Sequence, residues 1–199
     1  SNSAIFSTNQ KYYINTFSNI STPTLITLND NRGKELTTLL DNSKLKAQTA
    51  QLNMPQKEFF PFRTSSGVEL NGWMMKPANF NANKKYPVIL HQYSGPGSQQ
   101  VIDRWGIGSF GDGGLFEAYM CDKGYIMVCV DGRGTGGRGA AFEKCTYLQL
   151  GVKEAEDQVE TARYLGTLPY IDGKRIGIWG WSFGGYNTLM SMSDGSGAF

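Results

Sequence analysis

The sequence predicts an α/β fold that is preceded by a short series of antiparallel strands. The second half of the chain contains strand-like segments with uninterrupted apolar cores, which are typical of parallel strands covered by helices on both faces. These segments are Tyr86–Tyr93, Tyr125–Asp131 and Arg175–Gly180. Amphipathic segments lie between them, as the crossovers of a parallel sheet require. The N-terminal part instead has short runs rich in aromatic and β-branched residues, separated by turn-forming clusters.

These four N-terminal runs predict an antiparallel meander. The runs are Ala4–Ser7, Tyr12–Phe17, Thr24–Leu28 and Glu35–Leu39. Their spacing is typical of β-sandwiches and of β-propeller blades. About four strands do not make a stable domain alone, so we expect them to dock on further structure. The polar segment Asp41–Gln51 is mildly helical and is interpreted as a connector.

The remaining elements follow in the order of an α/β domain with an antiparallel start. They are a hairpin from Glu58–Thr64 and Val68–Pro77, a helix over Gly114–Lys123 with Asp112 as its cap, and a helix over Val152–Leu165 ended by Gly166 and Pro169. The last helix has one apolar stripe and an opposite charged face, which is the pattern of a helix that covers a sheet.

Composition narrows the classes of function. The 199 residues are 40% hydrophobic and 18% charged, with a net charge of +2, which indicates an ordinary globular protein and gives no reason to expect a nucleic-acid partner. No apolar stretch approaches the roughly 20 residues of a membrane-spanning helix, so we expect no span in this chain. Cys121, Cys129 and Cys145 form no zinc-binding or CxxC pattern, and we expect no metal.

One motif carries the chemistry. Gly180-Trp181-Ser182-Phe183-Gly184 follows an apolar strand and opens a helical segment, which is the context that a nucleophile elbow of an α/β-hydrolase requires. The serine must sit on a strained turn, and side chains at Gly180 and Gly184 would collide with the neighbouring strand and helix. Ser182 is therefore the candidate nucleophile, and the N–H of Phe183 is the expected oxyanion donor.

A second glycine motif competes for the interpretation of the site. Gly132–Gly137 fits the G-x-G-x-x-G pattern after a strand, with Glu154 and Glu156 about twenty residues further on, as in a dinucleotide-binding fold. No helix is predicted to open at Gly137, because residues 138–142 prolong the loop. We therefore favour a structural glycine loop and expect no cofactor.

The general base is harder to place. His91 is the one histidine of the sequence, and with Asp131 and Ser182 it follows the order of a chymotrypsin-type triad. An elbow serine instead belongs with an aspartate and a histidine that come later, so we interpret His91 as a residue of the strand or of the pocket lining. The residues after Ser182 include Asp194 and no histidine. We expect the triad to be completed elsewhere and these 199 residues alone to be inactive.

Five blocks of sequence together resemble the dipeptidyl peptidase IV branch of the prolyl oligopeptidase family. In order, they are Lys84–Val88, Tyr93–Gln99, Asp131–Gly134, Glu156–Gln158 and Gly180–Tyr186. Lys11–Tyr13, Ser21–Pro23 and Leu40–Asn42 are similar to the end of that family's β-propeller. The resemblance implies that residues 1–52 are the end of a propeller and a connector, and that residues 53–199 are a catalytic domain that is incomplete at its C-terminus.

The resemblance also assigns roles. It implies that Ser182 is the nucleophile and that the Tyr93 hydroxyl and the Phe183 N–H form the oxyanion hole, although many relatives have tyrosine where Phe183 stands. It implies a serine exopeptidase that releases di- or tripeptides from peptides with a free N-terminus, after Pro or Ala. Trp181 and Tyr186 are expected to pack around the elbow. A homodimer and a periplasmic, secreted or surface location are further expectations of the resemblance.

Two alternatives stay open at this point. One is another hydrolase on the same elbow, such as an acylaminoacyl peptidase or an esterase. The other is a catalytically incomplete fragment that acts as an interaction module, although the presence of Ser182 argues against a silent relative, because such proteins lose their nucleophile.

Overall fold

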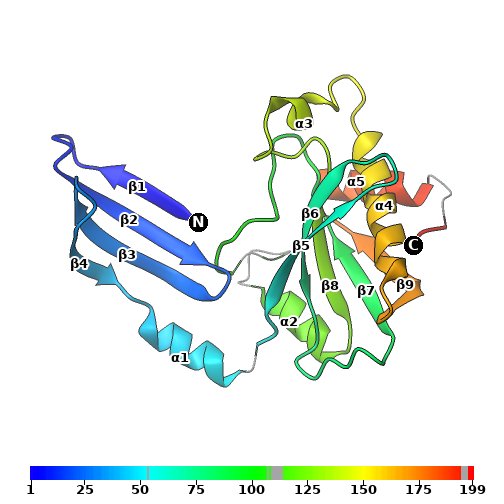
Figure 1. Cartoon of the computed structure of the whole chain (residues 1–199), viewed down its shortest axis with the longest axis horizontal. Coiled ribbons are helices and arrows are strands. Elements are labelled where there is room, and N and C mark those ends of the chain that lie inside the picture. The colour runs from blue at the N-terminus through cyan, green and yellow to red at the C-terminus, as the bar shows by residue number, and fades with distance from the viewer. Residues whose placement is uncertain (53, 107, 109–113, 194–196) are drawn as a thin grey trace.

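The computed structural model describes residues 1–52, 54–106, 108, 114–193 and 197–199, and within them it contains two separate sheets (Figure 1). The first sheet is antiparallel, in the order β1-β2-β3-β4. Its strands are β1 (Asn2–Phe6), β2 (Tyr12–Asn19), β3 (Thr22–Asp30) and β4 (Glu35–Leu40). They confirm the predicted meander, and helix α1 (Ser43–Gln51) follows as the expected connector.

The second sheet has the strand order β5-β6-β8-β7-β9 among the described residues. Its strands are β5 (Lys57–Arg63), β6 (Glu69–Met75), β7 (Tyr86–His91), β8 (Ile126–Asp131) and β9 (Ile171–Trp179). The hairpin β5-β6 pairs antiparallel onto β8, whereas β8, β7 and β9 are parallel. The carboxyl ends of these parallel strands therefore lie at one edge of the sheet, where α/β folds bind their ligands.

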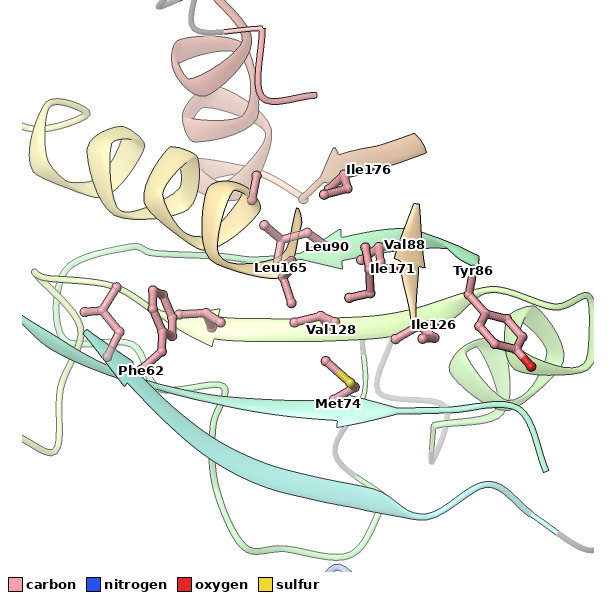
Figure 2. Close-up of a cluster of buried hydrophobic side chains, with 13 residues drawn as sticks. Phe62, Met74, Tyr86, Val88, Leu90, Ile126, Val128, Leu165, Ile171 and Ile176 are labelled. Carbon is pink, nitrogen blue, oxygen red and sulfur yellow. The ribbon is translucent and has the colours of Figure 1, made fainter. Parts of the chain in front are cut away.

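Helices cover both faces of this sheet. They are α2 (Leu115–Asp122), α4 (Lys153–Thr167) and α5 (Phe183–Ser193), whereas the short helix α3 (Ala140–Lys144) lies in the connection after β8 (Figure 1). On one face Leu165 of α4 packs on Leu90 and Val128, within the cluster shown in Figure 2. On the other face Cys121 of α2 packs with Met127 and Cys129. Burial of a leucine of this kind contributes about 1.5–3 kcal/mol. The core thus holds the three parallel strands rigidly between α2 and α4.

Several boundaries differ from the sequence-based expectation. A short helix, α3, begins at Ala140, where a loop was expected, because the chain turns at Gly139 (φ 87°) and Arg138 stacks on Phe142. Strand β9 begins at Ile171 rather than at Arg175, because Ile171 pairs with Tyr86 across the sheet.

The ends of three other elements also shift. Gly166 does not end α4, which continues to Thr167. The expected cap Asp112 lies outside the described residues, and Gly114 occupies the N-cap of α2 in the left-handed region. Strand β7 ends at His91, so Tyr93 belongs to the loop that follows. In the described part of the chain, no helix combines the length and apolar character needed to cross a membrane.

Candidate active site

Ser182 lies at a strained turn between β9 and α5. Its φ is 55°, in the left-handed region that costs an L-residue roughly 1–2 kcal/mol. Helix α5 starts at the next residue, where the N–H of Gly184 donates to the Trp181 carbonyl at 2.9 Å and that of Tyr186 donates to the Ser182 carbonyl at 3.1 Å. The serine is solvent-exposed at the N-terminal end of this helix, where backbone N–H groups favour a developing negative charge. The predicted elbow geometry is therefore confirmed.

The two glycines of the motif have the packing role that the sequence predicts. A Cβ at Gly180 would collide with the Gln92 carbonyl oxygen and lie 2.7 Å from the Gly184 carbonyl. A Cβ at Gly184 would lie 2.5 Å from the same Gln92 oxygen and 3.1 Å from the Tyr93 Cα. The neighbouring strand end and the helix thus approach the elbow too closely for any side chain. The serine is held in its strained conformation by this close approach.

We expect Gly180→Ala to lower the free energy of unfolding by about 1–3 kcal/mol, because the added methyl meets backbone atoms that cannot rotate away. The measurement is thermal or urea denaturation of the variant beside Gly166→Ala. In α4 the nearest atom to a Cβ at Gly166 is 3.9 Å away, so that alanine is expected to be neutral or to stabilise by up to about 1 kcal/mol. Equal effects of the two alanines would contradict the packing role of Gly180.

Tyr93 lies beside the elbow on the loop after β7. Its ring centroid is 6.3 Å from that of Phe183, and Gly95 leaves room for the ring. The next residue, Ser94, is buried with φ 59°, and its Oγ accepts a hydrogen bond from Gln158 Nε2 at 3.2 Å. In the described part of the chain the Tyr93 hydroxyl forms no hydrogen bond, so it is available to a ligand. The structure thus brings Ser182, Phe183 and Tyr93 into one region.

The glycine loop at 132–137 has structural contacts. The Gly97 N–H donates to the Gly134 carbonyl at 3.0 Å, and the Gly136 N–H donates to the Ser98 carbonyl at 2.8 Å. This loop therefore supports the loop that carries Tyr93. The acidic residues considered for a nucleotide are also engaged: Glu154 accepts from the Gly151 N–H at 3.0 Å, and Glu156 pairs with Arg133 at 3.0 Å.

A buried ion pair fixes the glycine loop to α4. Arg133 Nη2 lies 2.6 Å from Asp157 Oδ1, and the Arg133 backbone N–H donates to the same carboxylate at 2.7 Å. Burial raises the pKa of Asp157, and its hydrogen bonds with Arg133 oppose that shift. The pair thus attaches the start of the glycine loop to α4.

His91 is not arranged as the base of Ser182. Its ring packs on Trp179 at 5.1 Å between centroids, it is 5% exposed, and burial lowers its pKa to about 4. Among the described residues its Nδ1 has no hydrogen-bond partner. Asp131, the other member of the alternative triad, accepts the N–H groups of Gln100 and Val101, and burial raises its pKa to about 6. The interpretation of His91 as a strand residue is confirmed.

Two residues at the elbow escaped the sequence analysis. Gln92 is fully buried, and its Nε2 donates to the Gly184 carbonyl at 2.6 Å and to Thr188 Oγ1 at 3.0 Å. Its Oε1 accepts from Nδ2 of the equally buried Asn187 at 3.1 Å. These partners lie more than ninety residues apart in sequence, and no local motif signals such a contact.

The aromatic residues of the elbow divide into two kinds. Tyr186 packs as expected, with its ring 5.5 Å from that of Phe183 and its hydroxyl donating to the Leu150 carbonyl at 3.2 Å. The expectation for Trp181 was wrong, because its side chain is 77% exposed beside Ser182. A large aromatic surface in this position is open to contact from outside the elbow.

Comparison with known proteins supports the interpretation of the fold. The model of the prolyl oligopeptidase family matches residues 115–199. A solved structure of dipeptidyl peptidase 4 from Porphyromonas gingivalis is similar over 100% of this chain and 27% of its own, with 50% identity and a TM-score of 0.93. The chain is also 39% identical to a protein of Aspergillus flavus named "Probable dipeptidyl peptidase 4", over 99% of this chain and 25% of that protein.

A third relative, named "Probable dipeptidyl-aminopeptidase B", from Fusarium vanettenii, is 37% identical over 79% of this chain and 17% of its own. The chain thus spans about a quarter or less of the length of these relatives. The matches extend across both sheets and the elbow, with the backbone in the same arrangement. Over its whole length the chain is similar to proteins of the dipeptidyl peptidase IV branch of the prolyl oligopeptidase family.

Proposed function

We propose that Ser182 is the nucleophile of a serine exopeptidase that releases di- or tripeptides from free N-termini, after Pro or Ala. The observation that carries the proposal is the exposed serine at φ 55°, directly before the first turn of α5. The names of the relatives from P. gingivalis and A. flavus favour dipeptides as the product.

The proposed reaction has two steps. The Ser182 Oγ attacks the scissile carbonyl carbon, its proton passes through a general base to the leaving amine, and an acyl-enzyme forms. Water then attacks the ester, and Ser182 recovers its proton. In both steps the carbonyl oxygen becomes negatively charged, and the Phe183 N–H and the Tyr93 hydroxyl are proposed to donate to it. A tyrosine is suited to this role because it is a neutral donor at pH 7.

The base and its aspartate partner are proposed to come from a part of the protein outside these 199 residues. His91 is the one histidine here, and it packs on Trp179 inside the sheet. We also propose that residues 1–52 form the end of a β-propeller with its connector, that residues 53–199 belong to the catalytic domain, and that the protein forms a homodimer. The four antiparallel strands β1–β4 support the first of these assignments.

The proposal is tested with three substrates on the protein at its natural length. A fluorogenic Gly-Pro amide with a free amine is expected to be hydrolysed, whereas its N-acetylated form is not. A simple aryl ester serves as the control for unspecific acyl transfer. Preference for the acetylated peptide would indicate an acylaminoacyl peptidase, and hydrolysis of the ester alone would indicate an esterase. Either result would refute the exopeptidase.

A further inference from the structure

We propose that Gln92 is a positioning residue that fixes the distance between the two donors of the oxyanion hole. The inference rests on the proposed function and deepens it. One donor, the Tyr93 hydroxyl, belongs to the residue that follows Gln92 in the chain. The other, the Phe183 N–H, is at the first residue of α5. The side chain of Gln92 joins the segment that carries Tyr93 to α5, in addition to the pairing of β7 with β9.

The contacts of Gln92 show how this connection works. Its backbone N–H donates to the Trp179 carbonyl at 3.2 Å, which ties it to the end of β9. Its side-chain amide donates to the carbonyl of Gly184, two residues after Ser182, and to Thr188 one turn later. The backbone of Gln92 thus binds the strand end before the elbow, and its side chain binds the helix that begins after the elbow. A displacement of α5 along its axis would break the side-chain bonds.

Asn187 completes the connection. Its Nδ2 donates to Gln92 Oε1, and both side chains are fully buried. A buried amide that loses its partner costs the desolvation of the group that remains, whereas replacing both partners with apolar groups is close to neutral. This difference allows the stability role of the pair to be separated from its role in the reaction.

The chemistry requires such a connection because the oxyanion hole acts through fixed geometry. Its donors must lie about 2.7–3.1 Å from the position of the oxyanion, and misplacement by about 1 Å can cost roughly 100-fold in rate. Tyr93 has Ser94 held on its other side by Gln158 of α4. The Gln158–Ser94 hydrogen bond connects the Tyr93 loop to α4 only, whereas Gln92 connects it to α5, where the other donor lies.

The test compares Gln92→Leu with the double variant Gln92→Leu/Asn187→Leu in the protein at its natural length, with the free-amine Gly-Pro amide as substrate. Both are expected to lower kcat by about 10-fold or more and to change KM less than about twofold, because the lost interaction acts in the transition state. The double variant is expected to recover the part of the thermal stability that the unpaired Asn187 amide costs, without recovering kcat. Recovery of both would show that the amide pair is only structural and would overturn the inference.

A double-mutant cycle that combines Gln92→Leu with Tyr93→Phe gives a second readout. If Gln92 acts through the oxyanion hole, the losses in kcat from Gln92→Leu and Tyr93→Phe are less than additive; additive losses would contradict it. Ser191→Ala is the control. The buried Ser191 hydroxyl lies on the same helix and donates to the Asn187 carbonyl at 2.7 Å. The kcat of this variant is expected to stay within twofold of that of the wild type. An inactive wild type would refute the proposed function and this inference together, whereas an active wild type with an unaffected Gln92→Leu variant would refute this inference alone.

Discussion

Ser182→Ala is expected to lower kcat/KM for a free-amine Gly-Pro amide by about 10⁴-fold or more, because loss of the nucleophile in a serine peptidase leaves only the contribution of the oxyanion hole and of binding. The measurement is steady-state hydrolysis by the protein at its natural length. Ser182 is exposed and stands at a turn whose close contacts involve its neighbours, so the alanine variant is expected to fold like the wild type. Residual activity within tenfold of the wild type would exclude Ser182 as the nucleophile.

Ser182→Gly is the matched variant that separates chemistry from strain. Glycine adopts φ near 55° without the steric cost that serine and alanine carry, so this variant is expected to be inactive but about 1 kcal/mol more stable than Ser182→Ala. Denaturation of the two variants side by side measures the difference. A glycine variant no more stable than the alanine variant would show that the turn holds no such strain.

Arg133→Ala is expected to reduce the free energy of unfolding by about 3–5 kcal/mol, because it leaves the carboxylate of Asp157 buried without its cation. The Asp157 side chain is fully buried, and four of its hydrogen bonds come from Arg133. Urea denaturation of the variant and the wild type at pH 7 gives the value. The Tyr93 loop is expected to loosen as well, since the Gly134 and Gly136 peptide groups bond to it.

Glu156 provides the control for this prediction, because it pairs with the same arginine. Glu156 also pairs with Arg133 Nη2, at 3.0 Å, but its side chain is 50% exposed. Glu156→Gln is therefore expected to cost at most about 1 kcal/mol. Replacing the buried pair together, as Arg133→Met with Asp157→Leu, is expected to recover most of the stability. A loss from Arg133→Ala no larger than that from Glu156→Gln would show that burial adds nothing to the pair.

The features that the sequence predicts are those that depend on residues close together in the chain. The elbow could be predicted because its strand, its glycines and its helix follow one another within a dozen residues around Ser182. The apolar cores of β7, β8 and β9 likewise indicate parallel strands, because burial on both faces removes the polar alternation. The position of Tyr93 beside the elbow came from the family resemblance, since a tyrosine at a strand end has no distinctive local pattern.

The features that could not be predicted depend on contacts between distant segments. The start of β9 at Ile171 is set by its pairing with Tyr86, and the role of Gln92 is set by its contacts with Gly184 and Asn187. The exposure of Trp181 depends on which neighbours approach the turn, and the residues adjacent in sequence do not determine it. Short helix α3 was missed because a single turn after Gly139 carries too few residues to show a period.

The hydrogen bonds between Gln92 and α5 also have a consequence for the order in which the protein folds. Gln92 and Gly184 are 92 residues apart, so their hydrogen bond closes a long loop, and the entropy of that closure must be overcome before the contact contributes any stability. Contacts of this sequence separation form slowly compared with local ones. A strained backbone persists only where its surroundings hold it in place. We therefore expect Ser182 to lie in a relaxed turn while the chain is being synthesised, and to adopt its φ of 55° only when β7 and β9 have come together.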